Sequence, residues 1–264
     1  MSYIEINNVW KEYSDQIVLE RINNQVEEGE FITIVGASGC GKTTFLNMLL
    51  GTESQTRGSI SIAGKPLRNE PDQERGIVFQ RYSVFPHLTV LQNVLLSREF
   101  EQSPLLSRLF GDAKHKAATE AREMIEAVGL SAALDKYPHE LSGGMQQRLA
   151  IAQALIKKPR ILLLDEPFGA LDPGIRADMH QLVLDLWQRY KLTIFMITHD
   201  LKEGFYLGTR LWVFDKDRID PQAPGAFGAR ITYDVPVGSV NADISKTLEK
   251  SIQQTAISNP EHAE

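Results

Sequence analysis

A glycine-rich loop near the start of the chain has the residue types that bind phosphate. The run from Gly36 to Thr43 matches the pattern Gly-x-x-x-x-Gly-Lys-Ser/Thr and lies between a dense apolar run and a helix-like segment. Glycines let backbone N–H groups approach phosphate oxygens closely, and the N-terminus of the following helix adds partial positive charge. A glycine turn without a ligand is the alternative, and the agreement of motif and setting argues against it. The candidate phosphate-binding residues are Ser38, Gly39, Cys40, Gly41, Lys42, Thr43 and Thr44.

A metal site and a catalytic base are indicated at the end of another apolar run. Asp165 and Glu166 follow Ile161–Leu164, which has the pattern of a buried strand. We expect Lys42 to reach the β and γ phosphates, and the Thr43 hydroxyl and the Asp165 carboxylate to hold Mg²⁺ from two sides. Glu166 is the candidate for polarising the attacking water, because adjacent residues at a strand end can serve metal and nucleophile separately.

Two further polar residues follow strand-like runs. His199 comes shortly after Thr193–Ile197, and Gln80 comes directly after Ile77–Phe79. Ligands of α/β sheets bind at the carboxyl ends of strands, so we interpret His199 as a group that contacts the γ phosphate and positions the water or Glu166, with a structural histidine as the alternative. The side-chain oxygen of Gln80 suits Mg²⁺ or the lytic water, although without its neighbours it would mean little.

A second glycine-rich element, Leu141-Ser142-Gly143-Gly144-Met145, begins a helical run. We interpret Ser142, Gly143 and Gly144 as a second phosphate-handling element, because the N-terminus of a helix favours anions. The element belongs to a helical segment inserted between Gln80 and Asp165. It is therefore not expected to reach ATP bound to its own chain.

Alternating strand-like and helix-like segments predict an α/β fold with a mainly parallel core sheet. The expected strands are Tyr3–Ile6, Phe31–Val35, Ile60–Ile62, Ile161–Leu164, Thr193–Ile197 and Arg230–Val237. The expected helices are Thr43–Leu50, Ala113–Val128, Gly143–Lys158 and Pro173–Tyr190. Gly51, Gly129 and Pro159 are expected to end the first three. This order places the phosphate loop between a strand and a helix.

Composition limits the classes of function. The 264 residues carry a formal net charge of −6, which gives no overall basic surface, so we expect no nucleic-acid partner. The single cysteine, Cys40, excludes an internal disulfide framework and fits a reducing compartment. No apolar run approaches the ~18 to 20 residues that span a bilayer, and the first residues lack the features of a secretory signal. A membrane role is therefore expected to come through a partner.

Taken in order, these motifs resemble those of the ATP-binding subunits of bacterial ABC importers, over nearly the whole chain. The resemblance identifies the Lys42 loop as the Walker A motif, Gln80 as the Q-loop, Leu141–Met145 as the signature, Asp165-Glu166 as the Walker B pair, Ala170-Leu171-Asp172 as the D-loop and His199 as the switch histidine. It implies catalytic roles for Glu166, His199 and Gln80, and Mg²⁺ ligands at Thr43, Gln80 and Asp165. It also implies that Tyr13 stacks on adenine, with plain packing of Tyr13 or Trp10 as the alternative.

The resemblance implies an arrangement of subdomains as well. An ABC-type P-loop ATPase domain is expected over residues 1–219, with an antiparallel β-subdomain and a helical subdomain inserted at about 81–160, followed by a short C-terminal extension over 220–264. Residues 97–116 look like an insertion that either touches a partner or membrane surface or packs within the helical subdomain. The short ending is most similar to the nitrate, sulfonate and taurine importers, with transporters associated with urea or guanidine metabolism as an alternative.

The function implied is ATP hydrolysis that drives import of a small solute, delivered by a binding protein, at the cytoplasmic face of the inner membrane. Two ATP-binding subunits, identical or different, would dimerise head to tail so that Ser142 caps the γ phosphate on Lys42 of the partner subunit. A helix of a separate permease would dock near Tyr82–Leu88, with packing in the subdomain core as the alternative.

Three other classes of ATP-binding protein remain open. A soluble ABC ATPase without a transport role usually has tandem domains or a long coiled-coil insertion, and this chain has neither. An ATPase of a lipid or export system would be distinguished by its permease. A catalytically silent scaffold is disfavoured because Lys42, Gln80, Glu166 and His199 are all present.

Overall fold

The computed structural model describes residues 2–14, 16–80, 83–102, 112–218, 220, 222–223 and 225–239. The chain forms two compact units, Met1–Asp72 together with Thr193–Glu264, and Gln73–Leu192. The phosphate loop and His199 therefore belong to the first unit. The candidate residues from Gln80 to Glu166 belong to the second.

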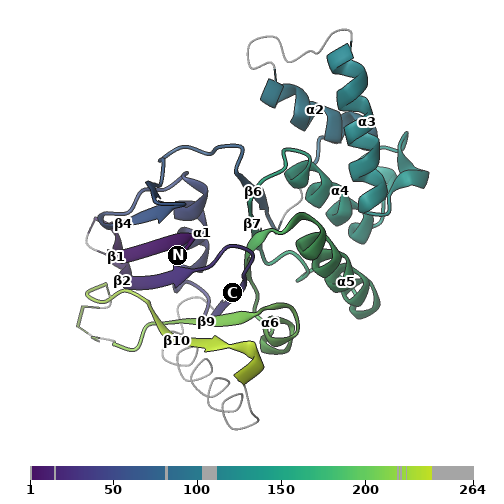
Figure 1. Ribbon diagram of the computed structural model, residues 1–264. Coiled ribbons are helices and arrows are strands. Elements are labelled where there is room, and N and C mark those ends of the chain that lie inside the picture. Colours follow the sequence, from purple (N-terminus) through teal and green to yellow (C-terminus); the bar gives the residue numbers. More distant parts are fainter. Residues whose placement is uncertain are drawn as a thin grey trace. The chain divides into compact units, whose positions relative to one another are not determined.

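An antiparallel sheet forms one layer of the first unit (Figure 1). Its four strands are β1 (Ile4–Tyr13), β2 (Gln16–Val26), β4 (Arg57–Ile62) and β5 (Lys65–Pro66), in the order β2-β1-β4-β5. The short strand predicted at Tyr3–Ile6 is thus the beginning of a longer one. Strand β2 was not predicted, and its polar and apolar residues alternate irregularly because the pairing of β1 with β2 contains register shifts.

Strands of the second sheet complete the first unit. Its members there are β3 (Phe31–Gly36), β8 (Thr193–Ile197), β9 (Arg210–Asp215) and β10 (Arg230–Pro236), in the order β10-β9-β3-β8. Strand β3 is parallel to both of its neighbours, and β10 is antiparallel to β9. All residues of β3 and β8 are buried, as the continuous apolar runs predict for parallel strands covered on both faces.

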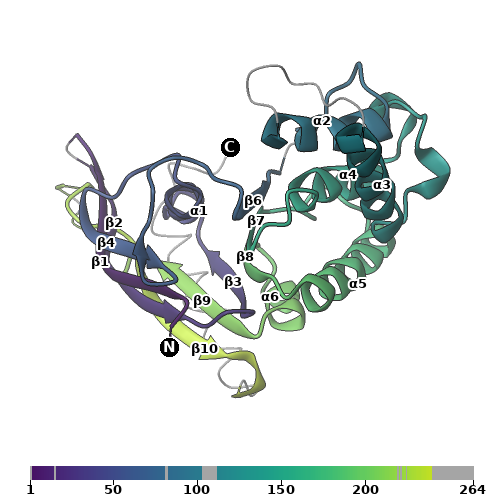
Figure 2. The ribbon, with the colours of Figure 1, turned by 45° about the horizontal axis from the view of Figure 1, so that its top comes forward.

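Helix α1 (Lys42–Leu50) lies between the antiparallel sheet and strand β3, as Figure 2 shows. Its buried Phe45 makes aromatic contacts with Phe195, Trp212 and Phe214, at centroid distances of 6.4, 6.1 and 5.4 Å. These rings come from β8 and β9, so the core fixes the helix against the parallel strands. The helix ends at Gly51, as predicted, and the Gly51 N–H donates to carbonyl oxygens of the last turn.

Among its described residues, the second unit combines two parallel strands with α-helices (Figure 1). The strands are β6 (Arg75–Val78) and β7 (Ile161–Asp165), and the helices are α2 (Val90–Gln102), α3 (Asp112–Ala127), α4 (Gly143–Leu155) and α5 (Pro173–Tyr190). Helix α4 ends three residues before the predicted Lys158. Lys158 precedes Pro159, which disfavours the helical conformation, and Lys158 has φ 55° while its N–H closes a turn onto the Leu155 carbonyl.

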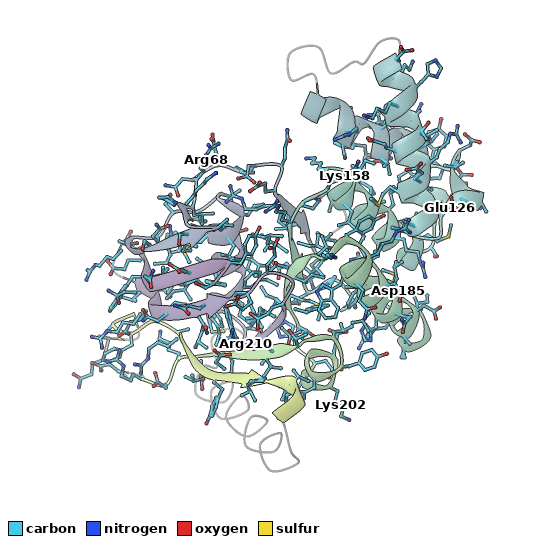
Figure 3. All side chains as sticks on the ribbon, in the orientation of Figure 1. Arg68, Glu126, Lys158, Asp185, Lys202 and Arg210 are labelled. Carbon is cyan, nitrogen blue, oxygen red and sulfur yellow. The ribbon has the colours of Figure 1, made fainter. Side chains whose placement is uncertain are left out.

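One arginine attaches the C-terminal strand to the rest of the first unit. Arg210, labelled in Figure 3, binds the Asp234 carboxylate on β10, and it also donates to the Asn24 side chain at 2.7 Å and to the Gln25 carbonyl at 2.7 Å. Trp212 Nε1 donates to the same carboxylate at 3.0 Å. Strand β10 is therefore held to both β9 and β2 by charged hydrogen bonds.

Candidate nucleotide-binding site

The phosphate loop holds its own lysine. Lys42 is 5% exposed, and its Nζ donates to the carbonyl oxygens of Gly36 and Ala37, each at 2.8 Å. The Cys40 sulfur lies 3.9 Å from the same nitrogen. The ammonium is therefore held at the loop by neutral carbonyl oxygens. A phosphate oxygen can take their place as the acceptor, and it carries a negative charge that they lack.

The start of α1 has no side-chain cap. The helix begins after Gly41, which has φ 83°, and it has no acidic residue in its first turn. A Cβ at Gly41 would lie 2.8 Å from both Val18 Cγ1 and Leu19 Cδ2, so only glycine fits there. The first N–H groups of a helix have no partner within the helix, and the dipole makes that end positive. The N-terminus of α1 therefore favours the binding of an anion.

Cys40 has the properties of a packed residue, not of a nucleophile. It is buried, and that burial raises the pKa of its thiol, with Lys42 acting in the opposite direction and Asp215 adding to the rise. The thiol is therefore protonated at neutral pH and poorly reactive.

Tyr13, the predicted adenine contact, is hydrogen-bonded to Thr44 in the first turn of α1. It ends β1 with 43% of its surface exposed, and Lys11 Nζ sits 4.6 Å from its ring centroid. Burial and the Glu53 carboxylate raise the pKa of the Tyr13 phenol, while Lys11 and Thr44 of helix α1 lower it. Lys11 is in turn fixed by Glu53 at 2.7 Å. Lys11 thus contacts one face of the Tyr13 ring and helps to fix the orientation of the ring.

His199 is exposed and follows β8 by two residues. Its neighbours are fixed on both sides. The buried Thr198 hydroxyl donates to the Glu203 carboxylate, and Asp200 caps helix α6 (Leu201–Leu207) by accepting from Lys202 N at 2.8 Å. This anchoring limits the backbone freedom of His199 and suits a residue that must contact one atom of a ligand.

In the second unit, Asp165 is the last residue of β7 and Glu166 follows it. Glu166 has φ 48°, in the left-handed region that costs a non-glycine residue about 1–3 kcal/mol. Such strain gathers at functional sites, where it aims a side chain.

The signature residues begin α4. Ser142 is exposed at the N-cap, where its Oγ accepts from Met145 N at 3.3 Å. Gly144 is buried, and a Cβ there would lie 2.5 Å from Ile175 Cγ2 on α5. Ser142 is thus exposed at the N-terminus of α4, whereas Gly144 packs closely on α5.

Gln80 is exposed and lies two residues after β6, because the strand ends at Val78 and not at Phe79 as predicted. Phe79 is 40% exposed and Phe85 is 39% exposed. The predicted docking residue Tyr82 lies outside the described residues, and so does part of the predicted insertion at 97–116.

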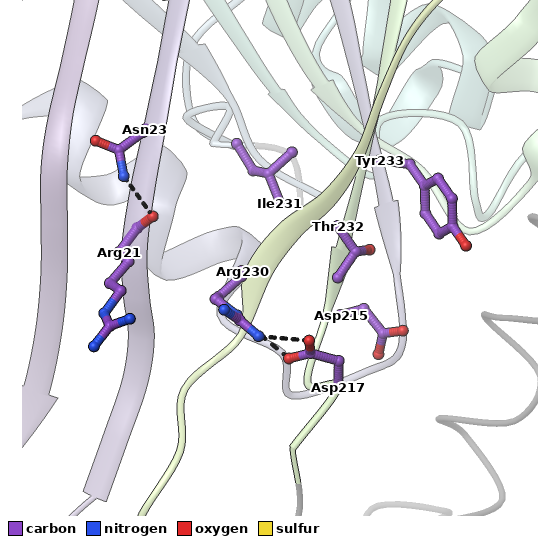
Figure 4. A pocket seen from close by; sticks show the side chains of 8 residues that line it. All are labelled: Arg21, Asn23, Asp215, Asp217, Arg230, Ile231, Thr232 and Tyr233. Atoms are coloured by element: carbon purple, nitrogen blue, oxygen red, sulfur yellow. Dashed lines mark hydrogen bonds and ion pairs between the residues drawn. The ribbon is translucent and has the colours of Figure 1, made fainter.

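A separate cavity of about 620 Å³ lies between β2 and β10 (Figure 4). Arg230 on its wall is paired with Asp217, and the Thr232 hydroxyl donates to the Val213 carbonyl at 3.3 Å. Asn23 donates to the Arg21 carbonyl at 2.9 Å. Several of its polar groups are thus bonded within the chain, and its lining includes none of the phosphate-loop residues.

A profile of the ABC transporter family, described as "ABC transporter", matches residues 19–169. The chain belongs to the ABC transporter family. The match runs from β2 to just beyond β7 and contains the phosphate loop, the signature and Asp165-Glu166.

Relatives within the ABC transporter family are named as importer subunits. The bicarbonate transport ATP-binding protein CmpD of Synechocystis sp. is 41% identical over 220 residues, covering 80% of this chain and 73% of the relative. The nitrate import ATP-binding protein NrtD of the same organism is 40% identical, covering 83% and 77%. The aliphatic sulfonates import ATP-binding protein SsuB of Bacillus cereus is 38% identical over 256 residues, covering 95% and 94%. The predicted nitrate and sulfonate branch is confirmed.

Solved structures of ABC transporter cassettes share the fold. The ADP conformation of MJ1267 superimposes with a TM-score of 0.79 at 22% identity, covering 98% of this chain and 100% of that one. The dimeric structure of MJ0796, a bacterial ABC transporter cassette, gives 0.71 at 28% identity, covering 89% and 98%. The predicted α/β ABC-type fold is confirmed.

As an ATP-binding subunit of an ABC transporter, the chain binds ATP and couples its hydrolysis to transport. Among its described residues no helix is both long and apolar enough to cross a bilayer.

Sequence reasoning missed the residues that orient the site. Lys11 precedes Tyr13 by two residues on β1, and strand periodicity puts such a pair on one face, which was a usable signal. Glu203 lies three residues after Asp200, in the spacing of a capping pair that begins α6. The contact between Lys11 and Glu53 joins two distant segments, and no local pattern indicated it.

Proposed function

We propose that the chain is one half of a head-to-tail pair of ATP-binding subunits that uses two Mg²⁺–ATP to drive import of a small anion through a separate permease. The observation that carries this proposal is the phosphate loop. There, the uncapped start of α1 directly follows a loop in which Lys42 is held by two carbonyl oxygens. A polyphosphate supplies the negative oxygens that suit both groups.

We propose that Thr43, Asp165 and Gln80 would hold a magnesium ion. The Thr43 hydroxyl, the Asp165 carboxylate and the Gln80 amide oxygen are hard donors of the kind that Mg²⁺ prefers. Among the described residues, no three His, Cys, Asp or Glu side chains gather as a softer metal would require. When bound, Mg²⁺ neutralises charge on the β and γ phosphates.

The remaining chemistry falls to side chains of this chain. Lys42 exchanges its carbonyl acceptors for β- and γ-phosphate oxygens and stabilises the charge that develops on them. Glu166 accepts a proton from the attacking water, and His199 contacts the γ phosphate and orients that water. Tyr13 stacks on the adenine ring with the face that Lys11 leaves open.

Dimerisation follows from the signature. Ser142 and Gly143 are exposed at the start of α4 and Gly144 is buried, and we propose that this helix N-terminus caps the γ phosphate on Lys42 of the partner subunit. The related cassette MJ0796 is dimeric in its solved structure. Two identical chains are the simplest pair, and hydrolysis would open it by removing the shared γ phosphate.

A permease would dock next to Gln80. Phe79 and Phe85 are exposed there, and residues 83–89, which we name the docking segment, lie outside any helix or strand. Exposed aromatic side chains suit a groove for a short amphipathic helix. We propose that this contact places the subunit at the cytoplasmic face of the inner membrane, with residues 1–219 as the ATPase domain, about 81–160 as its helical insertion and 220–264 as an extension.

The solute is proposed to be a small anion. Bicarbonate, nitrate and aliphatic sulfonates appear in the names of the three relatives, and all are small anions. Selectivity would reside in the permease and in a solute-binding protein that delivers to it.

Affinity purification from native membranes in mild detergent tests this proposal. We expect the tagged chain to retain a multi-span permease, and Phe85→Ser to lose it while Tyr206→Ser, which alters another exposed aromatic residue, keeps it. Recovery of soluble assemblies alone would contradict the transport role. Uptake of labelled bicarbonate, nitrate and a sulfonate by the recovered complex would then identify the anion.

A further inference from the structure

A buried asparagine holds the docking segment in shape. Asn93 lies in the first turn of α2 and is 0% exposed. Its Nδ2 donates to the carbonyl oxygens of Phe85 at 3.1 Å, Leu88 at 2.9 Å and Thr89 at 2.9 Å. Its Oδ1 accepts from Phe85 N at 2.8 Å. One side chain therefore satisfies the backbone of a segment that has no regular structure of its own.

The same asparagine is bonded to the signature helix. Gln153, near the end of α4, donates from Nε2 to Asn93 Oδ1 at 3.2 Å and to the Asn93 carbonyl oxygen at 3.4 Å. Asn93 Oδ1 thus accepts from the docking segment on one side and from α4 on the other. Both of its lone pairs and both of its amide hydrogens have partners, so the asparagine cannot rotate without losing several bonds.

We propose that Asn93 and Gln153 are positioning residues that tie the docking segment to the signature helix. The inference deepens the proposed function and rests on it. Helix α4 carries Ser142 at its N-cap and Gln153 eleven residues later, a separation of roughly 16 Å along a rigid helix. A change at the nucleotide end of α4 is therefore passed to the segment on which the permease docks, through a contiguous set of hydrogen bonds.

The burial of this link supports a strong coupling. Hydrogen bonds between side chains gain strength away from water, and an unpaired buried amide is costly. Moving Gln153 without moving Asn93 would remove one of the two donors to Asn93 Oδ1, and moving the Asn93 side chain alone would break its hydrogen bonds to the docking segment. Moving the docking segment and helix α4 together therefore costs less free energy than moving either of them alone.

Amide hydrogen exchange on the full chain tests the link without a permease. We expect a non-hydrolysable ATP analogue with Mg²⁺ to slow exchange in residues 36–44 and to alter it in residues 83–89 of the wild-type chain. Gln153→Leu should keep the first effect and reduce the second on the order of tenfold, the scale of a coupling of about 1 kcal/mol or slightly more. Ser97→Ala is the matched control, because Ser97 Oγ also donates to the Asn93 carbonyl, at 3.4 Å, but does not join it to α4.

The possible outcomes distinguish a failure of the proposed function from a failure of the Asn93–Gln153 link alone. No protection of residues 36–44 in the wild type would overturn the proposed function and the inference with it. Protection there, with the same response of residues 83–89 in wild type and Gln153→Leu or with none in either, would overturn the inference alone. Asn93→Asp keeps the size of the side chain and provides a second variant, which should lose the response as well.

Stimulation of ATP hydrolysis by the recovered permease gives an independent readout. Gln153→Leu should leave the kcat and KM of the isolated chain within about twofold and lower permease stimulation on the order of tenfold. In the double variant with Asn93→Ala the losses should not add, because both residues act through one contact. Additive losses, or equal losses of isolated and stimulated activity, would show a merely structural role.

Discussion

The ammonium of Lys42 donates a hydrogen bond to the carbonyl oxygen of Gly36, 2.8 Å away and at the other end of the phosphate loop. The lysine thereby closes the loop on itself. An ATP phosphate must take this ammonium from a neutral acceptor, and the exchange is favourable because a charged acceptor binds it more strongly. The same side chain therefore shapes the loop and stabilises the reaction.

Replacing Lys42 with methionine separates these roles. We expect ATP hydrolysis to fall at least about a hundredfold, because a group that stabilises developing phosphate charge is lost. The melting temperature should fall only slightly, since methionine keeps the aliphatic packing. Steady-state ATPase assays and calorimetry check this, and hydrolysis within a few fold of wild type would exclude the assigned role.

Replacing Glu166 with glutamine should stop turnover and keep nucleotide binding. The change preserves size and removes the proton acceptor, so we expect hydrolysis to fall by about 10²- to 10⁴-fold. With ATP and Mg²⁺ the variant should elute as a dimer in size-exclusion chromatography, because the γ phosphate persists. A variant that hydrolyses ATP normally would require another base, and one that stays monomeric with bound ATP would contradict the head-to-tail pair.

Lys11 offers a test of the adenine contact. Its Nζ lies 4.6 Å from the Tyr13 centroid and is fixed by Glu53. Lys11→Met should raise the KM for ATP several-fold with little change in kcat, because a cation–π contact contributes on the order of 1 kcal/mol to holding the ring. Tyr13→Ala should raise KM further and Tyr13→Phe hardly at all, since stacking uses the ring and not the hydroxyl.

Local motifs made much of this site predictable. The phosphate loop, β3 and α1 are consecutive, so one short pattern and its flanking residues indicated all three. The capping pair that begins α2 was also visible in the sequence, as Thr89 and Gln92, whose side chains each accept from the other's backbone N–H. Helix α2 was not among the predicted helices, although Pro86 precedes its start.

Long-range contacts were not predictable. Arg210 and Asp234 are 24 residues apart, and their pairing depends on the antiparallel register of β9 and β10, which no periodicity within either strand specifies. The hydrogen bond that joins Asn93 to Gln153 likewise links residues sixty positions apart. Sequence patterns supplied the candidate reactive residues, whereas the side chains that lie around them emerged only from the fold.

The Asp234 pair makes stability depend on pH. Burial alone would raise the pKa of Asp234, but hydrogen bonds from Arg210 and Asn24 outweigh it, so the pKa lies below its usual range. A carboxyl group with a lowered folded-state pKa stabilises the fold above its unfolded pKa of about 4, and this contribution is lost as the pH falls through the folded value. Asp234→Asn should therefore cost roughly 1 kcal/mol at pH 7, discounted for solvent exposure, and progressively less below about pH 4.

Urea unfolding of wild type and variant at several pH values checks this expectation. Asp178→Asn is the control, because Asp178 is an exposed carboxylate on α5 and should change stability little at any pH. A difference between wild type and Asp234→Asn that does not vary with pH would mean that the carboxylate charge contributes nothing.

A substitution of Gly144 in the signature tests whether this glycine is needed for helix packing or for contact with phosphate. A Cβ at this position would lie 2.5 Å from Ile175 Cγ2, and α5 is the only element it would meet within 4 Å among the described residues. Gly144→Ala should therefore destabilise the second unit by about 1–3 kcal/mol through overpacking. Because the added methyl group points at α5, the backbone N–H at the start of α4 stays available to a phosphate.

A second change can relieve the clash. Ile175→Ala removes the contacting methyl group, so the double variant should recover part of the melting temperature, with a non-additive term that reports direct contact. We expect ATP hydrolysis to recover with it, because the glycine would then be required for helix packing and not for approach of the γ phosphate. If stability returns while hydrolysis stays low, the phosphate itself demands a glycine, and residue 144 has a direct part in the nucleotide contact of the dimer.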